Sequence, residues 1–304
     1  MALVPPDFAH MPKQQITKYV LIVGAMKAGT TTLFRYLEQH PAICPSSPKE
    51  VSFFAFDALW SKGLDWYHDR FDFDAARHIW ALEGSTDYTK RPHCDGVIDR
   101  LRALPDVEYR IVYIMRNPLR RITSHAYHVD RTRQEIGQIM VERKDLSLDG
   151  GISDVWIDIS RYAYQIQPYV QAFGRDRVFL TTLEQLEADP EAVVSRVFGF
   201  LDLPPHPIDV SRRFNQKRPA RSPVALWTRA SAFAPFRLLY RAVTPQKLRA
   251  PLKRLFSRQR SGFGRFTLNA EEESYILRAL HDDLTRLSKE YGIDVERLWG
   301  ISLG

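Results

Sequence analysis

The sequence predicts an α/β fold in which a central parallel sheet is covered by helices on both faces. Short apolar runs alternate along the 304 residues with longer segments whose apolar residues recur at helical spacing. The short runs are almost continuously apolar, which is typical of strands buried on both faces. Strands that alternate with helices favour a parallel sheet. We expect a single domain over residues 1–304, with a basic helical elaboration at 210–270.

The first predicted elements are a strand, a turn and a helix in direct succession. Residues 19–23 are five consecutive apolar residues, which suits a buried strand. Two glycines flank the turn that follows, and the next apolar residues recur at helical spacing until Pro41 ends the segment. A helix is therefore expected near residues 30–39.

The remaining elements continue this alternation. Further strands are expected near residues 80–83, 109–115 and 177–182. Further helices are expected near residues 93–104, 118–131, 159–173, 190–202 and 270–290. The range 132–158 is charged and contains Gly150 and Gly151, so it is expected to form a loop or a short helix.

The turn after the first strand has the composition of an anion-binding site. It places Lys27 between two glycines, and three consecutive threonines begin the helix. In a strand–turn–helix unit of this kind, backbone N–H groups and the positive end of the helix dipole point at one spot. The pattern predicts a phosphate-type ligand.

A P-loop nucleotide triphosphatase or a magnesium-dependent kinase is the alternative, and the spacing argues against it. The P-loop lysine follows the second glycine, whereas here Thr30 follows Gly29 and the lysine stands at position 27. Such enzymes also hold Mg²⁺ with an acidic residue, but the buried run 110–115 ends at Arg116. An arginine there favours a second phosphate, and no metal is expected.

Five segments together resemble a known family. They are GAMKAGTTTL at 24–33, PKEVSFF at 48–54, LEGSTDY at 82–88, RNPLRRITSHAYH at 116–128 and RVFLTTLEQL at 177–186. In this order they resemble the sulfotransferases that use 3′-phosphoadenosine 5′-phosphosulfate (PAPS), in particular the glycan-type branch with the heparan sulfate enzymes and bacterial relatives. The resemblance covers residues 18–203 and returns at 266–299.

The resemblance implies a PAPS site with two phosphate-binding parts. The implied donor residues are Lys27, Ala28, Gly29, Thr30, Thr31 and Thr32 at the 5′-phosphosulfate, with Arg116 and Ser124 at the 3′-phosphate. Lys27 would also stabilise the charge on the leaving oxygen. Adenosine 3′,5′-bisphosphate would be the product.

The resemblance also implies a carboxylate general base. Glu50 stands where the glycan-type branch carries it, and the adjacent Lys49 would assist the sulfuryl group electrostatically. The small-molecule branch uses a histidine instead, for which the candidates here are His93, His125 and His128. We expect His125 and His128 to be structural, and Arg120 and Arg121 to lie on the helix surface.

Four further residues complete the expected site and its surroundings. Tyr162 stands where relatives place a tyrosine near the nucleotide, although a core aromatic residue fits equally. Arg260 and Arg265 resemble the glycine-and-basic loop that closes over the adenosine, with a different spacing. Trp299 is expected in the core.

The positive charge is concentrated in one segment. Residues 210–270 hold 15 Lys or Arg and no Asp or Glu, whereas the rest of the chain holds 28 basic and 36 acidic residues. This segment is expected to form a helical flap over the nucleotide, or a surface for an acidic glycan or an anionic membrane. Nucleic acid is not expected as a partner, because no nucleic-acid motif accompanies the charge.

Compartment and acceptor are the last expectations. Cys44 and Cys94 allow one disulfide at most, and no run approaches the ~20 apolar residues that span a bilayer. We therefore expect a cytoplasmic enzyme, peripheral at most to the inner membrane face. The resemblance implies a carbohydrate, a glycolipid or a natural-product acceptor; a catalytically inactive nucleotide-binding module is the further alternative.

Overall fold

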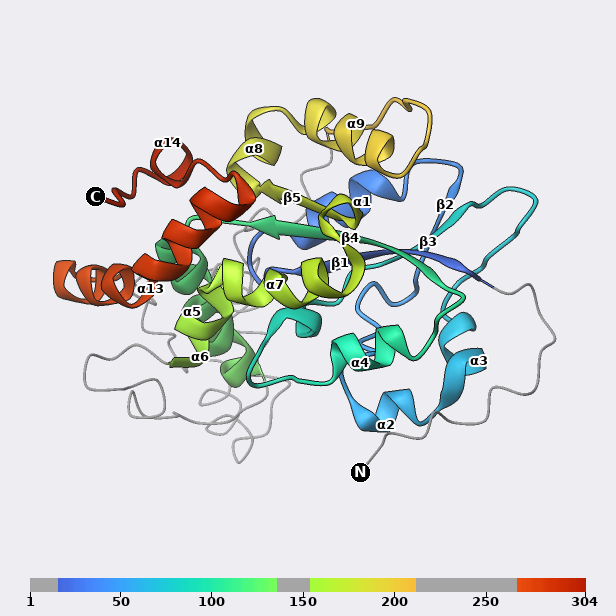
Figure 1. Cartoon of the computed structure of the whole chain (residues 1–304), viewed down its shortest axis with the longest axis horizontal. Helices are drawn as coiled ribbons and strands as arrows, with labels where there is room; N and C mark the ends of the chain where they lie inside the picture. Colours follow the sequence, from blue (N-terminus) through green and yellow to red (C-terminus); the bar gives the residue numbers. More distant parts are fainter. Residues whose placement is uncertain (1–15, 136–153, 212–266) are drawn as a thin grey trace, which may run out of the picture. The chain divides into compact units, whose positions relative to one another are not determined.

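Five parallel strands form the sheet of the computed structural model, which describes residues 16–135, 154–211 and 267–304 (Figure 1). The strand order is β2-β3-β1-β4-β5, and every neighbouring pair is parallel. The strands are β1 (Lys18–Gly24), β2 (Ile43–Pro45), β3 (Trp80–Glu83), β4 (Glu108–Met115) and β5 (Val178–Thr182). The predicted parallel sheet is confirmed, and the three-residue β2 is the strand that the sequence pattern did not predict.

Helices connect the strands and cover both faces of the sheet. The longer ones are α1 (Thr30–Leu37), α5 (Pro118–Glu135), α7 (Tyr162–Phe173), α9 (Pro190–Phe200) and α13 (Ala270–Tyr291). The shorter ones are α2 (Asp57–Trp60), α3 (Gly63–His68), η1 (Thr86–Thr89), α4 (Val97–Arg102), α6 (Asp154–Ser160), η3 (Arg175–Arg177), α8 (Leu183–Ala188) and α14 (Val295–Trp299). The predicted helix 159–173 is divided between α6 and α7, and α2, α3, η1, η3, α8 and α14 were not predicted.

The two faces of the sheet are packed by different side chains. Helices α1 and α9 lie on one face, where Val20, Ile22 and Ile114 belong to an aliphatic core (Figure 1). Because successive residues of a strand point to opposite faces, Tyr19 and Tyr113 face the other side. That side is covered by α4, α5 and α7 and is largely aromatic. Both faces are buried, as the continuous apolar runs predicted.

The strand order places several loops at one edge of the sheet. The chain passes from β1 outward to β2, returns to β3, and then crosses β1 to reach β4. This reversal lies at β1, and in open α/β sheets ligands bind at such a switch point, outside the carboxyl ends of the strands. The loops after β1, β2, β3 and β4 carry the predicted site motifs to this edge.

The C-terminal helices return to the same part of the sheet. Asp283 of α13 accepts hydrogen bonds from Ala163 N (3.0 Å) and Tyr164 N (2.8 Å) in the first turn of α7. Trp299 is 8% exposed, and its indole N–H donates to Glu184 Oε2 at 3.0 Å. Its predicted position in the core is confirmed.

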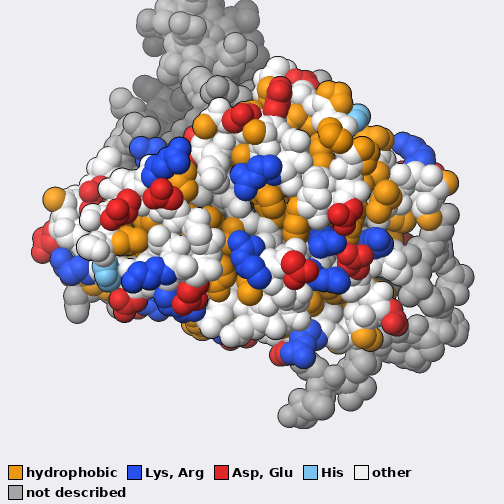
Figure 2. Space-filling view, turned by 45° about the horizontal axis from the view of Figure 1, so that its top comes forward, with side chains coloured by type: hydrophobic (Ala, Val, Ile, Leu, Met, Phe, Trp, Pro, Cys, Tyr) orange, Lys and Arg blue, Asp and Glu red, His pale blue; other side chains and the backbone are white. Residues whose placement is uncertain are grey.

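The described surface mixes charges of both signs. In the face shown in Figure 2, Lys and Arg side chains are interspersed with Asp and Glu. The basic segment 210–270 and its Arg260 and Arg265 lie outside the described residues, apart from the segment's two ends. Within the described ranges, we find no helix long and apolar enough to cross a bilayer.

Candidate active site

The turn after β1 is held in a conformation that few residues adopt. Lys27 and Gly29 have left-handed backbones, with φ of 68° and 93°. The N–H of Ala25 donates to the Ile114 carbonyl at 2.6 Å, which ties the turn to β4. A Cβ atom at Gly29 would lie 2.6 Å from Leu183 Cδ1, the movable end of a side chain, so the left-handed backbone is what favours glycine there.

Helix α1 presents its N-terminus at this turn. Gly29 is the N-cap and, as a glycine, has no side chain that could cap the helix. The first turn of the helix holds no acidic residue. The first N–H groups of a helix have no acceptor within the helix. Thr30 is buried, and Thr31 and Thr32 are partly buried on this first turn. The turn and helix therefore form the positively polarised site that the sequence predicted.

The second predicted anion ligand lies against the same turn. Arg116 follows β4 directly, and its Nη1 donates to the Lys27 carbonyl at 3.3 Å. Tyr162 donates its hydroxyl to the Arg116 carbonyl at 2.6 Å and is itself fully buried. Ser124 is partly buried on α5, about two turns after the start of the helix. The aromatic ring of Tyr162 thus belongs to the core, and it supports Arg116 through the backbone.

Lys49 joins three segments that are distant in the sequence. Its ammonium donates to Gly84 O at 2.7 Å, to Glu50 Oε1 at 2.9 Å and to Thr30 Oγ1 at 3.4 Å. The side chain is 12% exposed. Burial lowers the pKa of Lys49, and the charges of Glu50 and Glu83 raise it. The structure therefore brings the predicted residues Lys49 and Glu50 close to the turn between β1 and α1.

Glu50 is a solvent-accessible carboxylate at the same end of the sheet. Its side chain is 43% exposed, and its Oε2 accepts a hydrogen bond from Thr86 Oγ1 at 3.4 Å. Lys49 and Thr86 thus hold one oxygen each, while the group stays accessible from solvent. A carboxylate in this position can receive a proton from an entering hydroxyl or amine.

A second carboxylate, which the sequence patterns did not single out, is buried at the end of β3. Glu83 ends β3 and has no exposed surface. It accepts hydrogen bonds from Tyr67, Tyr88, Ser85 and the backbone N–H of Ser52. A charged residue at the end of an otherwise apolar strand was the signal that could have identified it.

Of the candidate histidines, His125 lies in the core and His93 lies at the surface. His125 is 7% exposed and packs against Trp156, with 5.6 Å between the ring centres. His93 lies at the surface, where its Nε2 is 3.0 Å from Asp158 Oδ2. The side chain of His128 lies outside the described residues. The prediction that His125 is structural is supported.

Arg121 corrects a prediction. It was expected on the helix surface, but it is fully buried. Its Nε donates to Ser160 Oγ at 2.7 Å and its Nη2 to the Trp156 carbonyl at 2.6 Å. Helix α6 covers this part of α5; the sequence pattern left 132–158 as a loop or a short helix and did not show that it packs over Arg121. Arg120, one residue earlier, is exposed as predicted.

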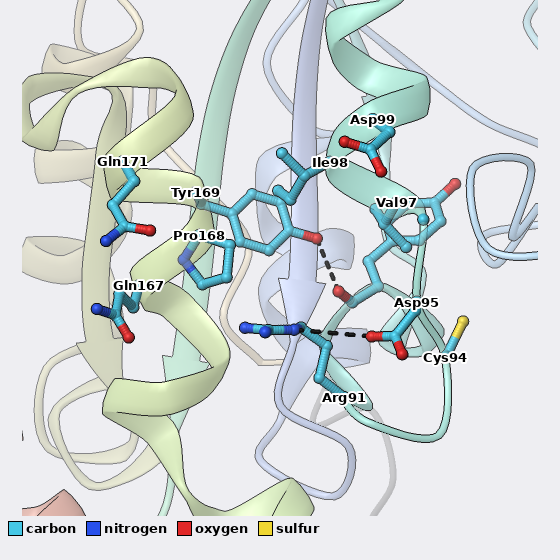
Figure 3. Close-up of a pocket in the computed structure, with 12 residues that line it drawn as sticks. Arg91, Cys94, Asp95, Val97, Ile98, Asp99, Gln167, Pro168, Tyr169 and Gln171 are labelled. Atoms are coloured by element: carbon cyan, nitrogen blue, oxygen red, sulfur yellow. Dashed lines mark hydrogen bonds and ion pairs between the residues drawn. The ribbon is translucent and has the colours of Figure 1, made fainter. Parts of the chain in front are cut away.

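A cavity of about 380 Å³ lies elsewhere, between the start of α4 and the middle of α7 (Figure 3). Arg91 points toward Asp95, with 3.8 Å between Nε and Oδ1, and stacks on the Tyr164 ring. The hydroxyl of Tyr169 donates to the Tyr88 carbonyl at 2.7 Å. The cavity is lined by residues other than the predicted site residues.

Known proteins of one family are similar to this chain. Residues 17–222 match the sulfotransferase domain family. The chain is 24% identical over 214 residues to heparan sulfate glucosamine 3-O-sulfotransferase 5 of Mus musculus, covering 69% of this chain and 60% of that protein. It is 23% identical over 233 residues to bifunctional heparan sulfate N-deacetylase/N-sulfotransferase 1 of Caenorhabditis briggsae, covering 71% of this chain and 26% of that protein.

A solved structure supports the same conclusion. The sulfotransferase from Alicyclobacillus acidocaldarius superposes with a TM-score of 0.53 at 25% identity, covering 74% of this chain and 93% of that one. The chain spans 60% and 26% of the length of the two curated relatives above, so it corresponds to a part of each. Its similarity to the heparan sulfate sulfotransferases is distant. On the family match, together with the strand order, the chain belongs to the sulfotransferase domain family.

Proposed function

We propose that this chain transfers the sulfuryl group of PAPS to a hydroxyl or an amine of a carbohydrate, a glycolipid or a related small molecule. The observation that carries the proposal is the position of the Lys49 ammonium, 3.4 Å from Thr30 Oγ1 in the anion-binding turn and 2.9 Å from Glu50 Oε1. A cation between a phosphate site and an accessible carboxylate suits transfer of an anionic group to an acceptor that must lose a proton.

The residues present fit PAPS at both of its phosphates. The N-terminus of α1, with the amides from Ala28 to Thr32, suits the 5′-phosphosulfate. Arg116 and Ser124 suit the 3′-phosphate, because they follow β4, the strand adjacent to β1. PAPS, when bound, supplies the sulfuryl group and leaves as adenosine 3′,5′-bisphosphate.

Each polar group of the edge then has a distinct role. Lys27 places a positive charge in the turn, where it stabilises the negative charge that develops on the leaving oxygen of an in-line displacement. Glu50 accepts the proton of the acceptor, because each of its carboxylate oxygens can accept more than the one hydrogen bond that Lys49 or Thr86 donates. Lys49 stays bound to Gly84 O and places its positive charge near the group that is transferred.

The donor is tested by thermal unfolding with two nucleotides. Adenosine 3′,5′-bisphosphate at 100 times its dissociation constant should stabilise the fold by about 2.7 kcal/mol. ATP with Mg²⁺ should stabilise it much less. Stabilisation by ATP with Mg²⁺ alone would overturn the proposal in favour of a kinase or triphosphatase. Stabilisation by adenosine 3′,5′-bisphosphate without any transfer would indicate an inactive binding module.

The acceptor class is tested by transfer of radiolabel. The relatives named above act on heparan sulfate by their printed names, and from them we propose a saccharide hydroxyl or amine. Radiolabelled PAPS should label a component of polysaccharide or lipid extracts in the presence of the protein. Label that appears only in small alcohols added as controls would exclude the carbohydrate acceptor.

We also propose that the basic segment 210–270 attracts an anionic acceptor or the inner face of the cytoplasmic membrane. The support is its charge of 15 Lys or Arg without Asp or Glu. Each basic residue near an anionic bilayer contributes up to about 1 kcal/mol, and salt screens the attraction. Co-sedimentation should therefore be strong with anionic vesicles at low salt and weak at high salt. Equal binding to neutral vesicles would contradict this proposal.

A further inference from the structure

Asp87 follows Thr86 in η1, and the proposed reaction assigns it no role. Its side chain is 21% exposed, and its two oxygens have different partners. Oδ1 accepts from the ammonium of Lys90 at 2.6 Å, and Oδ2 accepts from the hydroxyl of Ser52 at 2.8 Å. The second contact joins residues 35 positions apart, and Ser52 stands two positions after Glu50. Asp87 therefore links η1 to the segment that carries the proposed base.

The contact between Ser52 and Asp87 belongs to a series of hydrogen bonds that join residues 50–54 to residues 85–88. The others run from Thr86 Oγ1 to Glu50 Oε2 (3.4 Å), from Ser52 N to Ser85 Oγ (2.8 Å) and from Phe54 N to the Tyr88 hydroxyl (3.3 Å). Each of these hydrogen bonds uses a side chain of residues 85–88. Alternate residues of the first segment are therefore held by η1 and by the residue before it.

Helix η1 is itself fixed to the strand that leads into the anion-binding turn. The hydroxyl of Thr89 donates to the carbonyl of Val23 at 2.6 Å, one residue before the end of β1. From α7, the hydroxyl of Tyr169 donates to the carbonyl of Tyr88 at 2.7 Å. Thr89 and Tyr88 are both buried. The position of Glu50 relative to the donor turn therefore depends on η1, which contacts both.

The backbone at Ser52 requires support of this kind. Its φ of 54° is left-handed, a conformation that residues with a side chain rarely adopt. Ser52 is buried, and both its N–H and its hydroxyl donate to the segment 85–88. On the other side of Glu50, the N–H of Gly84 donates to the Lys49 carbonyl at 3.1 Å. Glu50 thus lies between two anchored residues, and loss of either anchor lets its backbone turn.

We propose that Asp87 is a positioning residue that holds the backbone of Glu50 against η1 through Ser52, and so sets the proposed base relative to the donor turn. This inference rests on the proposed function, since it assigns Asp87 to the same site. A misplacement of about 1 Å in a catalytic group costs about 100-fold in rate. A positioning role requires an oxygen that accepts from Ser52, which an amide also supplies. Proton transfer by Asp87 itself would require the carboxylate.

Hydrogen exchange measures this support without any substrate. The N–H groups of Ser52 and Phe54 donate to side chains of residues 85–88, so their exchange reports opening of the segment. Mass spectrometry of the full-length protein follows the peptide that covers residues 50–55. Its exchange should be about tenfold faster or more in Asp87→Ala, as expected for the loss of a hydrogen bond to a charged group. Asp87→Asn keeps an acceptor for Ser52 and should exchange like the parent protein.

Turnover supplies a second readout. With PAPS and an acceptor, kcat should fall by about 10–100-fold in Asp87→Ala and stay near the parent value in Asp87→Asn, while the affinity for adenosine 3′,5′-bisphosphate changes little. Unchanged exchange in folded Asp87→Ala overturns the inference and leaves the proposed transfer intact. An Asp87→Asn variant as inactive as Glu50→Gln, with exchange like that of the parent, overturns it in favour of proton transfer by Asp87. A parent protein without transfer removes the proposed function, and the exchange rates still decide whether Asp87 holds the segment.

Ser52→Ala tests the same contact from the other side, and it carries the test if Asp87→Ala does not fold. It keeps the backbone N–H and Cβ and removes the hydroxyl that donates to Asp87. Exchange and kcat should match those of Asp87→Ala, and the double variant should be no worse than either, because one hydrogen bond is lost in all three. Ser61→Ala is the matched control, since its hydroxyl donates to Ala58 O at an exposed position, and it should behave like the parent. Additive losses in the double variant show that Asp87 and Ser52 act separately, and the inference fails.

Discussion

The two halves of the candidate site are built in different ways. The proposed donor half is built mainly from one continuous segment, residues 24–32, whose backbone N–H groups would hold the 5′-phosphosulfate, with Arg116 and Ser124 after β4 for the 3′-phosphate. The proposed acceptor half consists of side chains from separate segments, with Lys49 and Glu50 after β2 and Thr86 in η1. A backbone site tolerates many side-chain changes, whereas a network of side chains responds as a unit. Substitutions in the two halves should therefore separate binding from proton transfer.

The largest expected effect tests the acceptor half. Glu50→Gln keeps the shape of the side chain but cannot accept a proton, so turnover should fall by about 10²–10⁴-fold. The affinity for adenosine 3′,5′-bisphosphate should stay nearly unchanged, because the donor half does not use this group. Single-turnover transfer and isothermal titration measure the two quantities.

Glu38→Gln is the matched control for this substitution, since Glu38 pairs with Arg35 on the exposed side of α1. His125→Ala should act through stability, because the ring is packed against Trp156. A folded and inactive His125→Ala beside an active Glu50→Gln would move the base to the histidine branch.

The second effect tests the donor half. Lys27→Ala should lower turnover by about 10²–10³-fold, because it removes the charge that stabilises the leaving oxygen. The fold should persist, since Lys27 is partly exposed and the turn is tied by its backbone. Lys18→Ala removes the same charge at the other end of β1, where Lys18 forms an exposed ion pair with Glu108 at 3.3 Å. That control should retain turnover, and an equal loss in both variants would contradict the role of Lys27.

The same difference explains how much could be predicted from the sequence. The donor half was predictable because its strand, turn and helix are contiguous, and the motif lies within residues 19–39. Glu83 was missed because its partners lie on short segments without a periodic pattern, such as α3 with six residues. Arg121 was placed on the surface because sequence spacing does not show that α6 packs over α5.

The third prediction sharpens the division within the donor half. Arg116→Ala should weaken binding of adenosine 3′,5′-bisphosphate by about 10–100-fold, as expected for the loss of charge-assisted hydrogen bonds worth about 1.5–3 kcal/mol. Turnover at saturating donor should change much less, because the 3′-phosphate is remote from the sulfur.

Arg120→Ala removes the same charge from an exposed position of α5 and is the control. Titration calorimetry compares the two variants. Unchanged affinity in Arg116→Ala would show that the second phosphate lies elsewhere, and it would leave the donor half with one anion site.

The smallest expected effect on turnover comes from Asp283, a carboxylate that lies outside both halves of the site. Burial raises the pKa of Asp283 to about 6, although its hydrogen bonds to the first turn of α7 lower it. The folded-state pKa thus exceeds the unfolded value of about 3.9. The folded protein therefore holds this proton more tightly, so the associated stability is present below about pH 4 and is lost as the pH rises through about 6.

Asp283→Asn isolates this contribution because the amide does not titrate. The free energy of unfolding of the parent protein, relative to the variant, should fall by about 2–3 kcal/mol between pH 4 and pH 7. Urea unfolding at several pH values measures the difference. Turnover at a fixed pH should be similar in the two proteins, because Asp283 contacts the backbone of α7 and lies outside both halves of the site. A difference in stability that is independent of pH would show that Asp283 stays ionised in the fold, and that its hydrogen bonds to α7 outweigh its burial.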